Sequence, residues 1–207
     1  MEGAFTLAVA WGGPVLAGAA QWISRKAGVW AAMVPAMSAL GVLALLTGRP
    51  VLSGDLGVVS AAGLGLGAGL LLYAGTVAFM FVFRGWPFLA RQAGKLYEQR
   101  GGLPLAAALA LAMLVVAPGE EGLWRGVVQP VLADGLGEVA GTAVAWAGYV
   151  GANALSGSLP VVLGAVVGGA AWAGLALWTG GILAGLLCHC VWTGLMILRP
   201  PVFSGRS

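Results

Sequence analysis

The sequence predicts an all-α, polytopic transmembrane helix bundle, and three observations lead to this fold class. Of the 207 residues, 60% are hydrophobic and only 8% are charged. A soluble domain usually carries about 25% charged residues, so these charges are too few to cover a soluble globule. Apolar runs of about 20 residues, the length that crosses a bilayer as a helix, recur along the whole chain. These observations exclude a soluble enzyme, a nucleic-acid-binding protein and a disordered chain.

Seven apolar segments make up almost all of the sequence, which we expect to form a single integral membrane domain over residues 1–207. The segments are residues 4–22, 28–48, 57–83, 103–133, 138–156, 160–178 and 180–198. The N-terminus lacks the basic start of a signal peptide, so we expect the first segment to be retained. Residues 84–102 mix basic with aromatic side chains, which predicts an amphipathic stretch at the membrane surface.

Basic residues gather on one side of this seven-span arrangement. That side receives Arg25, Lys26, Arg84, Arg91, Lys95, Arg100, Arg199 and Arg206. The opposite side receives Arg49, together with Asp55, Asp134 and Glu138. Because cytoplasmic loops are enriched in Lys and Arg, we expect a multi-pass protein of the cell inner membrane or plasma membrane. Its N-terminus would lie outside and its C-terminus in the cytoplasm.

Small and sulfur-containing residues carry less information about function. The 36 glycines recur at three- and four-residue spacing, which lets membrane helices approach one another closely. Cys188 and Cys190 point to different sides of one helix, so we expect no disulfide between them.

Three charged residues remain inside the fourth apolar segment: Glu120, Glu121 and Arg125. A charge at membrane depth costs at least a few kcal/mol, so these groups need internal partners or a polar cavity. Glu121 and Arg125 are four residues apart and can pair on one helix face, which leaves Glu120 as a spare carboxylate. Pro118-Gly119 predicts a loosened or broken helix that lines a cavity. The alternative is an ion pair that only fixes helix packing.

Two other segments carry polar pairs at the same spacing. Tyr149 and Asn153 share a face of the fifth segment, and His189 and Thr193 share a face of the seventh. His189 is the only histidine in the chain. Since each polar group would otherwise face lipid, we expect Glu120, Asn153 and His189 to line one cavity.

The run GEEGLWRG, from Gly119 to Gly126, resembles the Glu-Glu-x-x-x-Arg motif of the CPBP family. This family includes the type II CAAX prenyl proteases and bacteriocin-processing, Abi-like proteins. The run from Thr179 to His189 is similar in layout to the start of that family's third motif, His-x-x-x-Asn/Asp. The resemblance covers about residues 105–198, which would form a CPBP-like catalytic core. It implies a glutamate-dependent intramembrane protease, in which the first Glu and a His activate water while a second His and an Asn stabilise the oxyanion.

Two positions depart from the family pattern. Asn153 stands where the second motif, Phe-x-x-x-His, has its His, and Thr193 stands where the third motif ends in Asn or Asp. Glu120 would act as the base and His189 as a second proton-handling group, while Asn153 and Thr193 would offer hydrogen bonds to the oxyanion. The candidate catalytic residues are therefore Glu120, Glu121, Arg125, Asn153, His189 and Thr193.

The function we expect is that of an intramembrane endopeptidase acting on a membrane-associated or C-terminally anchored peptide or protein. The alternative is a catalytically degenerate relative that serves as a membrane scaffold, chaperone or immunity protein, and Asn153 favours this reading. A small transporter fits less well, because the charges cluster on one helix. We expect no cofactor and no nucleic-acid partner, only the substrate and the lipid bilayer. A metal site is the remaining rival, but a catalytic zinc usually takes three protein ligands.

Overall fold

A computed structural model describes residues 2–98 and 102–201 of the chain. Every regular element within these residues is a helix, so the predicted all-α bundle is confirmed. Arg100 and Arg206, two of the basic residues counted above, lie outside the described residues.

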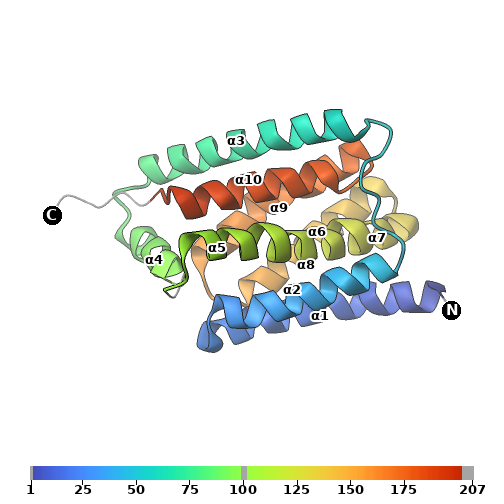
Figure 1. Ribbon diagram of the computed structural model, residues 1–207, viewed down its shortest axis with the longest axis horizontal. Helices are drawn as coiled ribbons and strands as arrows, with labels where there is room; N and C mark the ends of the chain where they lie inside the picture. Colours follow the sequence, from blue (N-terminus) through green and yellow to red (C-terminus); the bar gives the residue numbers. More distant parts are fainter. Residues whose placement is uncertain (1, 99–101, 202–207) are drawn as a thin grey trace.

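Six long helices and one composite helix correspond to the seven expected segments. The six are α1 (Glu2–Ala27), α2 (Val29–Leu46), α3 (Val58–Val82), α8 (Glu138–Ala154), α9 (Leu159–Thr179) and α10 (Leu183–Leu198). The composite helix runs through α5 (Leu105–Leu111), η1 (Ala112–Val116), α6 (Ala117–Leu123), η2 (Trp124–Val128) and α7 (Gln129–Leu136). Figure 1 shows these segments side by side, with α8 and α9 behind the composite helix and α3 beside α10.

Among the described residues, five helical stretches are long and apolar enough to cross a membrane. They are Gly3–Ala27, α2, α3, Leu105–Leu136 and α9. The other two, α8 with 17 residues and α10 with 16, are shorter. A multi-pass membrane protein therefore fits the structure, with seven helical segments that alternate in direction (Figure 1).

The composite helix continues through Pro118 and Pro130, so of the two outcomes expected at Pro118, a loosened or a broken helix, the structure shows the loosened one. A proline ring clashes with the carbonyl four residues earlier, and for Pro118 and Pro130 that carbonyl belongs to Leu114 and Gly126. Both of these residues lie in π-helical turns, η1 and η2, where the helix is wider. We attribute the continuity to this widening, because it loosens the helix just where each ring needs room.

Glycines let helices approach closely around the composite helix and α10. A Cβ at Gly69 of α3 would lie 2.7 Å from the Cβ of Val191 and 2.9 Å from the carbonyl oxygen of Cys188 in α10. A Cβ at Gly41 of α2 would lie 3.3 Å from the Cα of Gly119 in α6. These contacts leave no room for larger side chains, as expected for membrane helices that associate through small residues.

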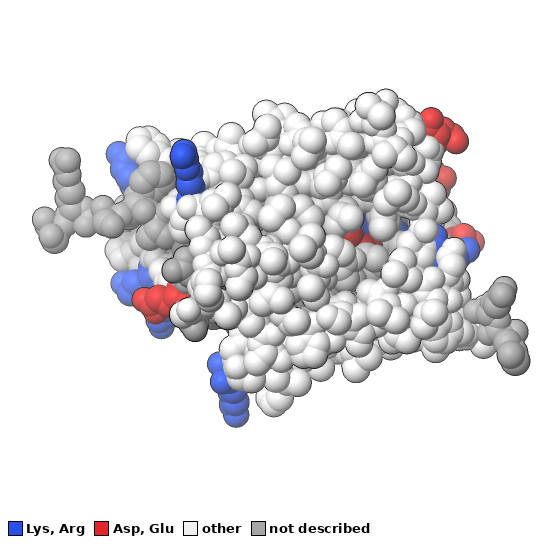
Figure 2. Space-filling view, viewed as in Figure 1, with Lys and Arg blue, Asp and Glu red and all other residues white. Residues whose placement is uncertain are grey.

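Charged side chains lie mainly at the two ends of the bundle. Figure 2 shows most Lys and Arg atoms at the end where the C-terminus lies and most Asp and Glu atoms at the other, with a largely uncharged surface between them. The short helix α4 (Pro87–Glu98) lies at the basic end. It is amphipathic, as the sequence predicted, since Leu89 and Ala93 are buried while Arg91 and Lys95 are exposed.

Candidate active site

The charged cluster of the composite helix is buried at the centre of the bundle. Glu120, Glu121 and Arg125 are only 6%, 0% and 4% exposed. Buried charges are stable only when they are paired and hydrogen-bonded, so the partners of these three groups determine what the cluster can do.

Glu121 is held by two partners from different helices. Arg125 approaches its Oε1 with a guanidinium nitrogen at 3.5 Å, which is the pair expected from the sequence. The same oxygen lies 2.9 Å from Nδ1 of His189 on α10, a contact that the sequence analysis missed. Because a carboxylate accepts hydrogen bonds, the tautomer that fits this contact carries a proton on Nδ1, which then donates a hydrogen bond to Glu121. The other ring nitrogen, Nε2, is thereby directed away from Glu121.

Glu120 is held on the other side of the His189 ring. The hydroxyl group of Tyr149, on α8, donates a hydrogen bond of 2.9 Å to Oε2 of Glu120. The same oxygen lies 3.9 Å from Nε2 of His189, so the imidazole bridges the two carboxylates. When His189 is protonated, its charge and that of Arg125 balance the two carboxylates. The buried cluster then has no net charge.

Aromatic rings fix the orientation of the cluster. The Trp172 ring stacks on the imidazole of His189, with centroids 3.6 Å apart and planes 9° apart. The guanidinium of Arg125 lies 4.5 Å from the centroid of the Tyr149 ring, and its Nη2 donates to the carbonyl oxygen of Gly169 at 3.0 Å. The Trp172 ring thus holds the imidazole of His189, and the Tyr149 ring and the Gly169 carbonyl hold the guanidinium of Arg125, in the orientations described.

Asn153 takes part in a separate set of hydrogen bonds. Its Nδ2 donates to the carbonyl oxygen of Tyr149 at 2.9 Å, and its Oδ1 accepts from Nε2 of Gln21, on α1, at 2.9 Å. Among the described residues, no hydrogen bond joins Asn153 to Glu120, and Tyr149 is hydrogen-bonded to both.

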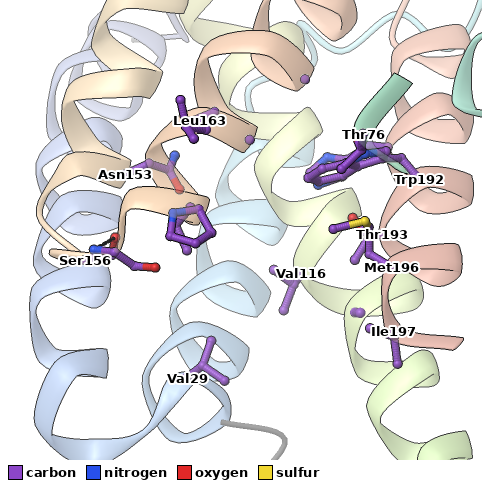
Figure 3. A pocket seen from close by; sticks show the side chains of 18 of the residues that line it. Val29, Thr76, Val116, Asn153, Ser156, Leu163, Trp192, Thr193, Met196 and Ile197 are labelled. Atoms are coloured by element: carbon purple, nitrogen blue, oxygen red, sulfur yellow. Dashed lines mark hydrogen bonds between the residues drawn. The ribbon is translucent and has the colours of Figure 1, made fainter. Parts of the chain in front are cut away.

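A large cavity joins these groups. It has a volume of about 990 Å³, and its walls include Glu120, Asn153, His189 and Thr193. The expected convergence on one cavity is therefore present. In Figure 3, Asn153 lies on one wall and Thr193 on the opposite one, with Val116 between them. Among the described residues, no hydrogen bond joins Thr193 to Glu120, Asn153 or His189.

The cavity extends from the charged cluster to the basic end of the bundle. Its walls reach Arg25 at the end of α1, Leu89 of α4 and Pro200 after α10. Most of the lining side chains are apolar, and the polar ones include Glu120, Ser156 and Ser158. This shape suits a ligand with a long apolar part and a few polar groups.

Sequence reasoning did not identify Gln21 and Trp172 as part of the site. Gln21 could have been found, because an amide inside an apolar segment needs a polar partner. Trp172 could not, since nothing distinguishes it from the other eight tryptophans. Tyr149 was noted only as a neighbour of Asn153, while its hydroxyl group proves to bind Glu120.

The chain offers few groups for a metal. Within residues 2–98 and 102–201, no three His, Cys, Asp or Glu side chains are arranged to hold an ion. Cys188 and Cys190 are buried and free, and Glu121 and His189 bind each other. That the protein needs no cofactor stays a prediction.

Comparison with known proteins connects this site with one family. No curated protein and no solved structure matches the chain. The family described as type II CAAX prenyl endopeptidase Rce1-like matches residues 102–195. This segment contains all six candidate catalytic residues, whereas Gln21 lies outside it. This match confirms the resemblance to the CPBP family inferred from the sequence, over residues 102–195 of the chain.

Proposed function

We propose that the protein is an intramembrane endopeptidase that hydrolyses a peptide bond in a membrane-associated or C-terminally anchored substrate. One observation carries the proposal. Glu120 and Nε2 of His189 lie 3.9 Å apart at the wall of a cavity, while Glu121 holds the other ring nitrogen. A carboxylate and an imidazole placed in this way can transfer protons to and from one bound water molecule.

The proposed reaction needs one base and one set of hydrogen-bond donors. Glu120 removes a proton from water, and the resulting hydroxide bonds to the carbonyl carbon of the substrate. The electron pair of the C=O double bond moves to its oxygen. When the tetrahedral intermediate collapses, the C–N bond breaks and the proton on Glu120 passes to the leaving nitrogen. The C=O double bond re-forms, and the products are a carboxylic acid and an amine. A proton then passes from the acid to the amine to give a carboxylate and an ammonium group, and the proposed reaction uses no metal or other cofactor.

Side chains around Glu120 would stabilise the developing oxyanion. His189 lines the cavity and would offer a hydrogen bond to the oxyanion through Nε2, while Glu121 holds its other ring nitrogen. Asn153 adds a neutral amide donor, and Thr193 adds a hydroxyl group from the opposite wall. Removing one donor of this kind typically lowers kcat by about 10²–10³-fold.

The shape and charge of the cavity support an anchored substrate and an orientation. Its apolar walls would hold the membrane-embedded part of the substrate, and its basic end would face the cytoplasm. We therefore propose a multi-pass plasma or inner membrane protein with the N-terminus outside and the C-terminus in the cytoplasm. A reporter enzyme fused to the C-terminus and active only in the cytoplasm tests this orientation.

The catalytic test uses purified protein in lipid vesicles and two quenched fluorescent peptides. One peptide ends in a farnesylated cysteine followed by three residues, and the other ends in an apolar transmembrane anchor. We expect the wild-type protein to cleave at least one of them. Glu120→Gln keeps the size of the side chain but cannot accept a proton from water, so cleavage should fall by about 10²–10⁴-fold.

Glu138→Gln is the matched control. Glu138 begins α8 at the acidic end of the bundle and does not line the cavity. This variant should cleave at the wild-type rate. If the wild-type protein cleaves neither peptide, or if Glu120→Gln is as active as the wild type, hydrolysis at Glu120 is excluded. The non-catalytic relative, acting as a scaffold, chaperone or immunity protein, would then be the better explanation.

A further inference from the structure

We propose that Gln21 is a positioning residue for the catalytic site, which holds the Asn153 amide with one N–H directed at the reacting carbonyl group. The inference rests on the proposed function. Gln21 lies on α1, outside the residues matched by the family. The family resemblance therefore gives Gln21 no role, whereas its contacts in this chain do.

The first step is the orientation of the Asn153 amide. Its neighbour on the same helix is the carbonyl oxygen of Tyr149, at 2.9 Å, which can only accept a hydrogen bond. The nitrogen of Asn153 must therefore face Tyr149, and the oxygen must face the other way. At that position, Nε2 of Gln21 donates to the oxygen at 2.9 Å. The Tyr149 carbonyl thus selects one of the two possible amide orientations, and the N–H donor of Gln21 is matched to that orientation.

The second step concerns the N–H group that remains. The amide nitrogen of asparagine has two N–H groups, and the Tyr149 carbonyl takes only one. Asn153 lines the cavity together with Glu120 and His189, so the second N–H is available to a ligand there. If the Asn153 amide were turned around, its oxygen would replace the N–H group at the cavity. A developing oxyanion on the substrate would then be repelled.

The third step links Gln21 to the base. Tyr149, whose carbonyl accepts from Asn153, donates its hydroxyl group to Glu120 at 2.9 Å. Contacts therefore run from Gln21 to Asn153, from Asn153 to Tyr149, and from Tyr149 to Glu120. Gln21 and Asn153 are only 8% and 6% exposed, so water cannot easily replace the bond between them.

The fourth step explains how α1 reaches the site. Gly18 lies one turn before Gln21 and faces α8, where an added Cβ would come within 3.0 Å of Leu155 and 3.7 Å of the Cα of Ala152. The small residue lets the two helices approach beside Asn153. Gln21 can therefore reach the amide with an ordinary side chain of its length.

The test compares variants in the vesicle assay with whichever fluorescent peptide the wild type cleaves. Gln21→Met keeps the length of the side chain but removes the donor, so we expect kcat to fall between about 10- and 100-fold while KM changes little. This loss is smaller than that for removing an oxyanion donor itself. Gln129→Met is the matched control. Gln129 is also a buried amide that donates to a backbone carbonyl, but it does not line the cavity, so its kcat should stay unchanged.

A double-mutant cycle distinguishes positioning from a general structural effect. In an Asn153→Ala background, Gln21→Met should cause no further loss of kcat, because the amide that it orients is gone. If Gln21→Met gives too little folded protein, Gln21→Asn provides the same comparison, since its donor is one methylene further from Asn153. Melting temperatures in detergent identify variants that have lost their fold.

Two results would overturn the inference in different ways. If Gln21→Met and Gln21→Asn both keep the wild-type kcat while Glu120→Gln is inactive, Gln21 has no positioning role although the proposed function stands. The same conclusion follows if Gln21→Met lowers kcat equally in the wild-type and Asn153→Ala backgrounds. If the wild-type protein cleaves neither peptide, the proposed function fails and the inference fails with it.

Discussion

The helices α3, before residue 102, and α6, in the family-matched segment, differ sharply in how many of their residues are buried. Only three of the 25 residues of α3 are buried, Ala61, Gly65 and Gly69, whereas six of the seven residues of α6 are. Side chains such as Val59, 86% exposed, face outward from α3, where a membrane protein meets lipid. The charged groups of the site come from the matched segment, while the first helices provide cavity walls and contacts that position those groups.

The largest expected effect concerns the buried ion pair of the matched segment. Arg125→Ala leaves Glu121 without its guanidinium partner at a fully buried position. Breaking such a pair typically lowers the free energy of unfolding by about 3–5 kcal/mol. The melting temperature in detergent and the yield of folded protein should therefore both fall.

The control for this variant lies in the first half of the chain. Arg49 pairs with Asp134 at the acidic end, where the side chains are 35% and 67% exposed. An exposed pair contributes about 0.2–1 kcal/mol, so Arg49→Ala should melt close to the wild type. Equal losses for the two variants would show that burial does not set the cost of breaking these ion pairs.

A smaller effect is expected at the contact between the two regions. In Gly69→Ala, the new Cβ would meet Cys188 and Val191 of α10, which precede and follow His189 in the sequence. Overpacking of this kind costs about 1–3 kcal/mol and should shift α10, so both stability and cleavage should decrease. Gly67→Ala is the matched control, because nothing lies within 4 Å of its added Cβ. If both variants behave like the wild type, α3 does not position His189.

The smallest expected effect is that of metal removal. Because the proposed reaction uses Glu120 and His189 without an ion, dialysis against a zinc chelator should leave the cleavage rate unchanged. The rate is measured before dialysis, after it, and again after zinc is added back. A loss that zinc restores would replace this mechanism by metal-assisted hydrolysis.

The sequence was sufficient to predict the fold because the signal that defines a membrane helix is local. Each of the seven apolar segments has a helical counterpart, and the acidic and basic ends follow from residues between the segments. Pro118 was harder to interpret. It predicted a loosened or broken helix, and which of the two occurs depends on the geometry of the preceding turn, which local sequence does not determine.

The site was predictable only in part, for a related reason. Glu120, Glu121 and His189 could be found because ionisable groups at membrane depth are rare. That Glu121 binds His189 as well as Arg125 depends on how α10 packs against α6, and no spacing along the chain specifies this. Likewise, the Gln21 amide was visible in the sequence, but its partner lies 132 residues away.

The stack of Trp172 on His189 has a consequence for spectroscopy. An excited indole is quenched by a protonated imidazole in contact with it, and these two rings lie face to face at 3.6 Å. The emission of Trp172 should therefore report the protonation of His189 and any displacement of its ring by a ligand. In a variant that keeps only this one of the nine tryptophans, occupancy of the cavity could be followed optically, without a labelled substrate.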